Sequence, residues 1–198
     1  MRPARFILHQ PQTIREAVNL AKEGIIPLAG GQSLVPELRQ RNWSPAEIFS
    51  IAKVADLSET ISFSETSLNI GARVTVKQLL ENQQVKQYYP WLREAASKLG
   101  DVQVRNFATV VGNVCWSDPR ANLAVALLAS DAKILILNEN YGTEPTNLND
   151  FFTGFRKNTL GSRIACGIEV PYVPNRGGTY MEFSRQPQDL ALVNLGAV

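Results

Sequence analysis

The segment Pro27-Leu28-Ala29-Gly30-Gly31-Gln32-Ser33-Leu34 carries the strongest fold signal in this chain of 198 residues. It follows the apolar pair Ile25-Ile26 and precedes residues 34–38, whose apolar positions have helical spacing. This order predicts a strand, a tight glycine turn and the first turn of a helix, with Ser33 as the helix cap. The segment therefore predicts a strand-to-helix loop at the carboxyl end of a strand.

Such a loop has two possible roles. Adjacent glycines can take positive φ and bring the backbone close to a ligand, and neighbouring N–H groups can then bind anionic oxygens such as those of a diphosphate. The alternative is a plain strand-to-helix turn with a glycine hinge, because short glycine motifs have many false positives. The loop alone leaves both interpretations open.

Composition and charge exclude several classes of protein. Apolar residues make up 44% of the chain, which is enough for a substantial core, and 20 Lys and Arg nearly balance 18 Asp and Glu. The sequence contains no basic cluster, so we expect no nucleic-acid partner. The apolar run at residues 6–8 is too short for a signal segment. The sequence also contains no apolar span of 18 residues, so we expect no membrane partner. We therefore expect a cytoplasmic protein.

The potential metal ligands are sparse. Cys115 and Cys166 stand far apart without a C-x-x-C motif, and His9 is the single histidine. This pattern argues against a zinc or iron–sulfur site in the chain. We expect both cysteines to be buried structural thiols.

The N-terminal part predicts a β-α-β unit. Residues 6–9 form a strand, and a capping box at residues 13–16 opens a helix that continues to Glu23 and stops at Gly24. Residues 25–28 then form the strand that leads into the glycine loop. No G-x-G-x-x-G motif is present, so a Rossmann fold is not supported.

A second lobe is predicted from about residue 58. A strand at 47–51 precedes it, residues 61–70 alternate as a hairpin, and a second capping box at residues 75–78 opens a helix. A further helix over 90–99 carries Trp91, which we expect to pack in the core rather than stack on a flavin.

Residues 102–119 form the second informative stretch. Gly112-Asn113 suits left-handed backbone conformations, and Asp118-Pro119 is typical of an N-cap followed by proline at the first helical position. Asp118 is therefore either a cap or a ligand-binding residue. Arg105 is either a surface residue or the partner of a carboxylate.

Taken together, these stretches resemble the FAD-binding medium subunit of molybdenum hydroxylases, the family of carbon monoxide dehydrogenase and xanthine dehydrogenase flavoproteins. The matching motifs occur in order along nearly the whole chain: Ala29-Gly30-Gly31-Gln32-Ser33-Leu34, Val104-Arg105-Asn106, Thr109-Val110-Val111-Gly112-Asn113, Asp118-Pro119, Ala126-Leu127-Leu128-Ala129, Asp131-Ala132, Phe151-Phe152 with Gly154, Thr159-Leu160, Ile168-Glu169-Val170-Pro171, and Phe183-Ser184-Arg185 with Asp189.

The resemblance implies an α+β fold, the two-lobed flavin-binding architecture shared with p-cresol methylhydroxylase (PCMH). We expect a first α/β lobe at 1–57 with the diphosphate loop, a second α+β lobe at 58–175, and the start of a C-terminal extension at 176–198. The family continues into a small C-terminal domain, whereas this chain stops inside the apolar run 190–198. We therefore expect truncation before or within that domain, because an exposed apolar end normally needs a partner or a continuation.

The resemblance also implies FAD as the cofactor and gives it a site. The glycine loop would hold the diphosphate, the second lobe would contact the diphosphate and the ribityl chain, Ile168 would lie near the cofactor, and Asp189 near the flavin. A Gly30→Val substitution would then clash with the diphosphate. We expect no catalytic residue and no metal ligand, because the cofactor carries the chemistry. The predicted cofactor-binding residues are Leu28, Ala29, Gly30, Gly31, Gln32, Ser33, Leu34, Ala108, Thr109, Gly112, Asn113, Asp118, Ile168 and Asp189.

The implied function is electron transfer. In the family, a large subunit with a molybdenum cofactor oxidises the substrate, two [2Fe–2S] clusters of a small subunit pass electrons on, and FAD hands them to an acceptor. Three positions depart from the family pattern: Val111 replaces a glycine, Asn122 an aspartate and Gln186 an arginine. A β-branched Val111 resists positive φ and would crowd the diphosphate. Two alternatives therefore remain, a stand-alone flavin oxidoreductase and a member that no longer binds FAD and keeps only subunit contacts.

Overall fold

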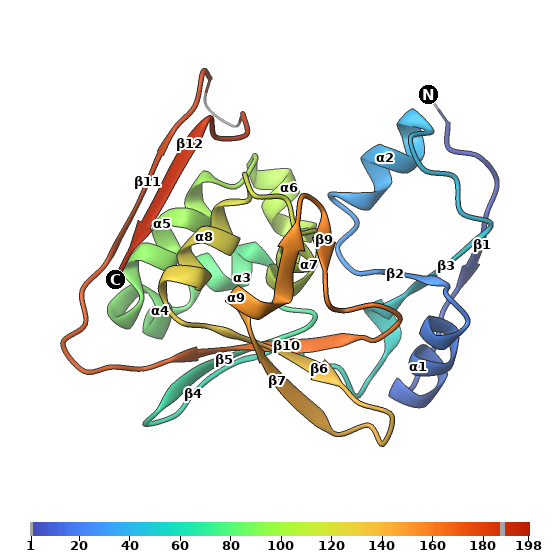
Figure 1. Ribbon diagram of the computed structural model, residues 1–198, viewed down its shortest axis with the longest axis horizontal. Helices are drawn as coiled ribbons and strands as arrows, with labels where there is room; N and C mark the ends of the chain where they lie inside the picture. Colours follow the sequence, from blue (N-terminus) through green and yellow to red (C-terminus); the bar gives the residue numbers. More distant parts are fainter. Residues whose placement is uncertain (1, 187–188) are drawn as a thin grey trace.

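The computed structural model describes residues 2–186 and 189–198, and it has the expected two-lobed α+β architecture (Figure 1). We use "first lobe" for residues up to 57 and "second lobe" for residues 58–175. These boundaries, and that of the C-terminal segment at 176, remain predictions, and residues 1, 187 and 188 of the predicted ranges lie outside the described residues.

The first lobe is a small parallel sheet in the order β1-β3-β2 with helices α1 and α2. In α1, Ala17, Val18 and Ala21 are buried against β3, which fits the predicted helical spacing. The helix stops where predicted, because Gly24 has φ +80°. The elements of the first lobe are β1 (Ile7–His9), α1 (Ile14–Lys22), β2 (Ile26–Leu28), α2 (Leu34–Gln40), β3 (Glu47–Ser50) and the short 3₁₀ helix η1 (Ile51–Lys53).

The second lobe is an antiparallel sheet in the order β4-β5-β10-β6-β7, with helices on one face (Figure 1). A separate two-stranded ribbon, β8-β9, follows α9. The elements are β4 (Ile61–Phe63), β5 (Ser67–Gly71), α3 (Val76–Glu81), α4 (Gln83–Tyr88), α5 (Pro90–Lys98), α6 (Val102–Phe107), α7 (Val110–Cys115), α8 (Asn122–Ala129), β6 (Lys133–Leu137), β7 (Thr143–Asn147), α9 (Leu148–Phe151), β8 (Phe152–Gly154), β9 (Lys157–Asn158) and β10 (Ala165–Pro171).

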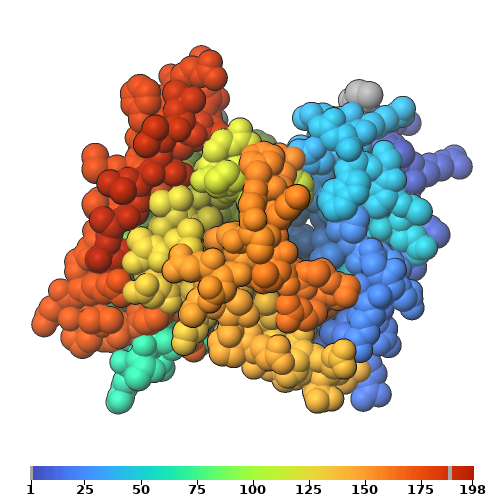
Figure 2. Space-filling model, viewed as in Figure 1, coloured from blue at the N-terminus to red at the C-terminus, as the bar shows by residue number. Residues whose placement is uncertain are grey.

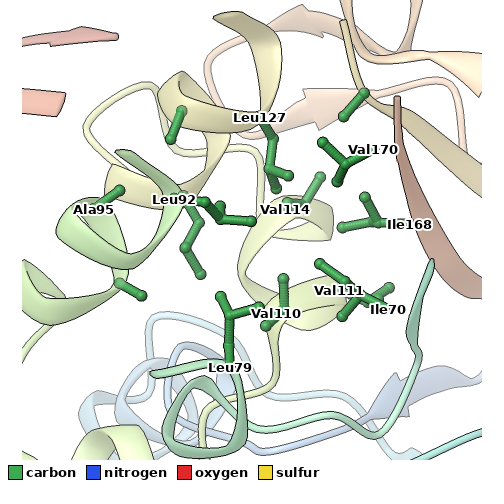
Figure 3. Close-up of a cluster of buried hydrophobic side chains, with 14 of the residues drawn as sticks. Ile70, Leu79, Leu92, Ala95, Val110, Val111, Val114, Leu127, Ile168 and Val170 are labelled. Atoms are coloured by element: carbon green, nitrogen blue, oxygen red, sulfur yellow. The ribbon is translucent and has the colours of Figure 1, made fainter. Parts of the chain in front are cut away.

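The main core lies between this sheet and its helices (Figure 3). Ile70 and Ile168 from the strands and Leu79 and Leu127 from the helices are all fully buried there. Trp91 is 2% exposed, and its indole N–H donates to Ser130 Oγ at 2.8 Å. The expectation that Trp91 packs in the core is confirmed.

The chain ends in an antiparallel hairpin of β11 (Thr179–Phe183) and β12 (Val193–Ala197) that leans on α5 and α8 (Figure 1). Tyr180 faces inward and is buried. The paired residues Met181 and Leu195 point outward, as does the pair Phe183 and Val193, and all four are more than half exposed. One face of the hairpin is therefore apolar and open to solvent.

Local hydrogen bonds confirm one of the two predicted capping boxes. Thr75 and Gln78 exchange both bonds of the motif at the start of α3. At α1, Thr13 Oγ1 accepts from Glu16 N–H at 3.2 Å, but the Glu16 carboxylate accepts from Gln12 N–H instead of Thr13 N–H. The predicted box at α1 is therefore only half formed.

Candidate functional site

A cavity of about 800 Å³ lies between the two lobes and takes its walls from both. Figure 2 shows its recess between the cyan part of the first lobe and the orange β8–β9 ribbon. The glycine loop after β2 forms one wall, and α7 with the segment before it forms the opposite wall. The volume lies in the range of small-molecule and cofactor sites.

The glycine loop reaches across to the second lobe. Gly31 has φ +74°, which confirms the need for a glycine at that position. A Cβ added to Gly30 would lie 1.9 Å from the carbonyl oxygen of Phe107. We predicted that Gly30→Val would clash with the diphosphate. This explanation is incomplete, because the valine would first collide with the backbone of the opposite lobe.

Ser33 does not act as predicted. It precedes α2 in helical conformation, with φ −96° and ψ −45°, and its side chain makes no capping hydrogen bond. An N-cap side chain normally needs extended backbone to reach the N–H groups of the first turn, so the local conformation explains the miss. Ser33 nevertheless lines the cavity, as does Gln32, whose amide donates to Gly30 O at 3.3 Å.

The opposite wall begins at the first turn of α7. Thr109 Oγ1 accepts from Gly112 N–H at 3.2 Å and caps the helix. The predicted left-handed conformation of Gly112-Asn113 is wrong, because both residues are helical. Gly112 has a packing role instead: its added Cβ would lie 2.5 Å from Thr109 Oγ1 and 3.5 Å from the Cβ of Ala29 in the other lobe. A glycine here therefore leaves room for the capping oxygen of Thr109, whereas the distance to Ala29 is an ordinary van der Waals contact.

Asn113 shows that the cavity fits a hydrogen-bonding ligand. Its Oδ1 is buried and has no hydrogen-bond partner in the described part of the chain. Buried polar atoms of this kind are rare in native proteins, and each normally indicates a water or ligand partner. Because Asn113 lines the cavity, its amide is available to a polar ligand there.

Two residues near this wall belong to the core. Val111 is 3% exposed and Ile168 is fully buried, and both side chains point into the hydrophobic cluster of Figure 3. Val111 lies in α7 without a positive φ, so its β-branched side chain does not strain the backbone as expected, although the residue also lines the cavity. Ile168 does not line the cavity, which corrects its expected position. Ile164 and Ala165 line the cavity from that side instead.

Asp118 lines the cavity but is neither cap nor free ligand. Helix α8 starts at Asn122 with Ala121 as its N-cap, so the predicted N-cap role of Asp118 is wrong. The carboxylate is 5% exposed and takes a bidentate pair from Arg120, with Nε to Oδ1 at 2.9 Å and Nη2 to Oδ2 at 2.8 Å. The hydrogen bond from Arg120 chiefly holds the pKa of Asp118 below its ordinary value. Arg105 likewise pairs with no carboxylate, and its guanidinium donates to the carbonyl oxygens of Leu99 and Gly100.

Of the predicted cofactor-binding residues, all but Ile168 line this one cavity, and Asp189 lies at its edge with Leu190. Asn122 also lines it, and its amide donates to Tyr180 Oη at 3.0 Å and to the Glu182 carboxylate. An aspartate at position 122 would place a second carboxylate against Glu182, so asparagine suits this surrounding. Gln186 does not itself line the described part of the cavity, but its carbonyl oxygen accepts from the N–H of the lining residue Asp189 at 3.2 Å.

The sequence analysis missed several lining residues. They include two cations, two aromatic side chains, one carboxylate and one amide: Lys98, Arg156, Trp43, Trp116, Glu37 and Asn42. The cavity therefore carries more charge than the neutral loop suggested. Two of these residues had a sequence signal: Trp116 lies within the informative stretch 102–119, and Arg156 lies two residues after the matched Gly154.

The two cysteines are free, and both residues are partly exposed, although the thiol of Cys115 is itself buried as expected. Cys115 lines the cavity, and burial raises the pKa of its thiol to about 12. Burial also raises the pKa of Cys166. Neither thiol is ionised near neutral pH, so neither is activated as a nucleophile. The described residues contain no group of three or more His, Cys, Asp or Glu placed to hold a metal ion.

Fold and cavity together define a two-lobed α+β cofactor-binding domain with its ligand site between the lobes. The family model for the FAD binding domain in molybdopterin dehydrogenase matches residues 4–173, and the chain belongs to this family. FAD is accordingly its cofactor. The glycine loop with Gly30 and Gly31 and the unpartnered Oδ1 of Asn113 both fit such a ligand.

Named relatives agree with this assignment. The chain is 33% identical to the glyceraldehyde dehydrogenase medium chain of Sulfolobus acidocaldarius, covering 98% of this chain and 70% of the relative. It is 29% identical to the xanthine dehydrogenase FAD-binding subunit of Escherichia coli O157:H7, covering 96% and 66%.

Among solved structures, carbon monoxide dehydrogenase from Hydrogenophaga pseudoflava matches with a TM-score of 0.91 at 29% identity, covering 96% of this chain and 68% of that one. The chain thus spans about two thirds of the length of these relatives. None of the helices in the described residues is long and apolar enough to cross a membrane.

Proposed function

We propose that the chain is the FAD-binding electron-transfer part of a molybdenum hydroxylase-type dehydrogenase, and that FAD lies in the cavity between the lobes. The observation that carries this proposal is the convergence of the glycine loop and the first turn of α7 on one cavity. These two segments lie about 80 residues apart in the sequence, and both match the family pattern. FAD would supply the redox chemistry, accepting and releasing electrons.

The residues of the chain have binding and positioning roles in this proposal. Residues 30–33 line the cavity, and their backbone N–H groups would suit the diphosphate. Asn113 offers an amide to the polar chain of the cofactor, and Thr109 fixes the turn that presents it. Trp116 and Leu160 add apolar surface that excludes water from the cofactor.

The proposal extends to partners. We propose that electrons arrive from [2Fe–2S] clusters of a small subunit, after substrate oxidation in a large subunit with a molybdenum cofactor. Support comes from the relatives, several of which are named as the medium chain or a subunit of a larger dehydrogenase. We also propose a cytoplasmic location, in keeping with this class of enzyme.

The first test is the visible spectrum of the purified chain after it has been mixed with excess FAD and desalted. We expect flavin absorption bands at near-stoichiometric amounts. A protein that is well folded by circular dichroism but stays colourless would overturn the proposal and favour a role limited to subunit contacts.

A matched pair of variants tests the site. Asn113→Leu removes the unpartnered Oδ1, so we expect FAD to bind about tenfold more weakly, the size of one lost hydrogen bond. The control is Asn69→Leu on β5, whose amide donates to Ser67 Oγ outside the cavity. Fluorescence titration gives both affinities. Equal affinities for the two variants would place the cofactor elsewhere.

A further inference from the structure

Arg156 joins both lobes at the edge of the cavity. Its Nη1 donates to Glu37 Oε1 on α2 of the first lobe at 3.0 Å. On the second lobe, its Nε lies 3.7 Å from Asp118 Oδ2, and its guanidinium lies 4.9 Å from the ring centre of Trp116. Among the described residues, the Arg156–Glu37 contact is the only ion pair between the lobes.

The backbone around Arg156 is fixed to the end of α7. Arg156 N–H donates to Ser117 O at 2.9 Å. The amide of Asn158 donates to Cys115 O at 2.9 Å and to Ser117 Oγ at 2.8 Å. Arg156 itself has φ +52°, an uncommon conformation for a residue with a side chain, which these bonds hold in place. These hydrogen bonds hold the β8–β9 turn against the end of α7, and the long side chain of Arg156 reaches from this turn to α2.

The charges needed for this contact are present at neutral pH. A hydrogen bond from Asn42 is the largest cause of a lowered pKa at Glu37, and Arg156 contributes. Arg120 is the main cause of the lowered pKa at Asp118, with Arg156 again contributing. Two carboxylates therefore face Arg156, one on each lobe, and both are ionised.

The remaining contacts between the lobes form no further ion pair among the described residues. Two of them involve charged side chains: Arg73 Nη1 of the second lobe donates to Ala52 O of the first at 2.9 Å, and the guanidinium of Arg15 lies 5.8 Å from the ring centre of Tyr141. Val18 and Phe49 of the first lobe share an apolar cluster with Ala72 and Ile164 of the second, and we call this cluster the base. Along the wall, Gly30 lies against the Phe107 carbonyl. The base can act as a hinge, because it is a continuous apolar cluster, whereas both Arg156 and Glu37 line the cavity between the lobes. Opening that side of the cavity requires the ion pair to break.

We propose that Arg156, Glu37 and Asp118 form an interlobe latch that sets how fast a cofactor enters and leaves the cavity. Arg156 is a positioning residue in this proposal, since it keeps α2 and the adjoining glycine loop against the second lobe. The cofactor part of the inference rests on the proposed function. The latch itself is a property of the chain without ligand.

The first experiment measures FAD release. Protein loaded with FAD is diluted into an excess of an FAD-specific apoenzyme as a trap, and release is followed by flavin fluorescence. We expect Glu37→Gln and Arg156→Gln each to release FAD on the order of tenfold faster, within the range of one charged hydrogen bond. The double variant should release FAD no faster than either single variant, because both remove the same contact. Added salt should speed release from the wild type and leave Glu37→Gln unchanged.

The control is Lys133→Met. Its ion pair with Glu169 spans 3.9 Å and is partly exposed like the latch, but it lies entirely within the second lobe. We expect wild-type release and wild-type salt dependence from this variant. Additive effects of the two latch substitutions, or release at the wild-type rate from both single variants, would overturn the latch.

The second experiment needs no cofactor. Hydrogen exchange of the apoprotein is compared over residues 34–41 and 152–158, on opposite lobes. Glu37→Gln should raise exchange in both segments, and Lys133→Met in neither. Unchanged exchange in both segments would overturn the latch. A wild type that binds no FAD but shows this exchange pattern would refute the proposed function and leave the latch supported.

Discussion

The two walls of the cavity are built by different physical means. The glycine loop of the first lobe presents backbone, and it is positioned by a close approach of Gly30 to the Phe107 carbonyl and by the positive φ of Gly31. The α7 wall presents side chains from a helix whose other face is fixed in the main core through Val110, Val111 and Val114 (Figure 3). The first wall therefore depends on contact with the opposite lobe, whereas the second is held by its own lobe.

This difference predicts the largest effect for Gly30→Val. The new side chain would overlap the Phe107 carbonyl, so the lobes must separate, at a cost of about 2–3 kcal/mol typical of overpacking. We expect a lower denaturation midpoint and loss of FAD together. Gly177→Ala is the control, since nothing lies within 4 Å of its added Cβ. Wild-type stability of Gly30→Val would show that the loop does not depend on the opposite lobe.

A smaller effect is expected from the helix cap on the α7 wall, and a matched cap elsewhere separates its effect on stability from its effect on FAD binding. Thr109→Val removes the cap of α7, and Thr75→Val removes the equivalent cap of α3 outside the cavity. Each substitution should cost about 1 kcal/mol in the free energy of unfolding, measured by urea denaturation. Only Thr109→Val should also weaken FAD binding, because it loosens the turn that carries Asn113. Equal FAD affinities would mean that α7 does not contact the cofactor.

The smallest effect is the response of the interlobe contact to acid. The pKa values of Glu37 and Asp118 are lowered in the folded protein from ordinary values of 4.5 and 3.8. Their contribution to stability is therefore fully present above those ordinary values and is lost as pH falls through the lowered folded values. We expect the thermal midpoint to fall less steeply below pH 4.5 in Glu37→Gln and Asp118→Asn than in the wild type. Parallel acid curves would show that neither carboxylate stabilises the fold.

Features set by neighbours in the sequence were predictable. The hairpin of β4 and β5, the stop of α1 at Gly24 and the capping box at Thr75 all depend on interactions within a few residues. The family resemblance implied which segments meet at the cavity, although it also included Ile168, which lies in the core.

Predictions failed where a neighbouring side chain determined the role of a residue. Gly112 was expected to need a left-handed backbone, but it is a helical glycine whose added Cβ would lie 2.5 Å from the capping oxygen of Thr109. Asp118 was expected to cap a helix, but Arg120 occupies its carboxylate. Sequence patterns show which backbone conformations a residue favours, and not which atoms lie opposite it.

The sequence by itself determined the local elements, because glycine turns, caps and apolar periodicity act over short distances. Its resemblance to the family implied the two-lobed architecture and the two segments that line the cavity. Tertiary structure alone decided how the lobes meet. Glu37 and Arg156 lie 119 residues apart, and no local pattern marks either as the partner of the other. Only the folded chain brings the carboxylate on α2 and the guanidinium on the β8–β9 turn within hydrogen-bonding distance.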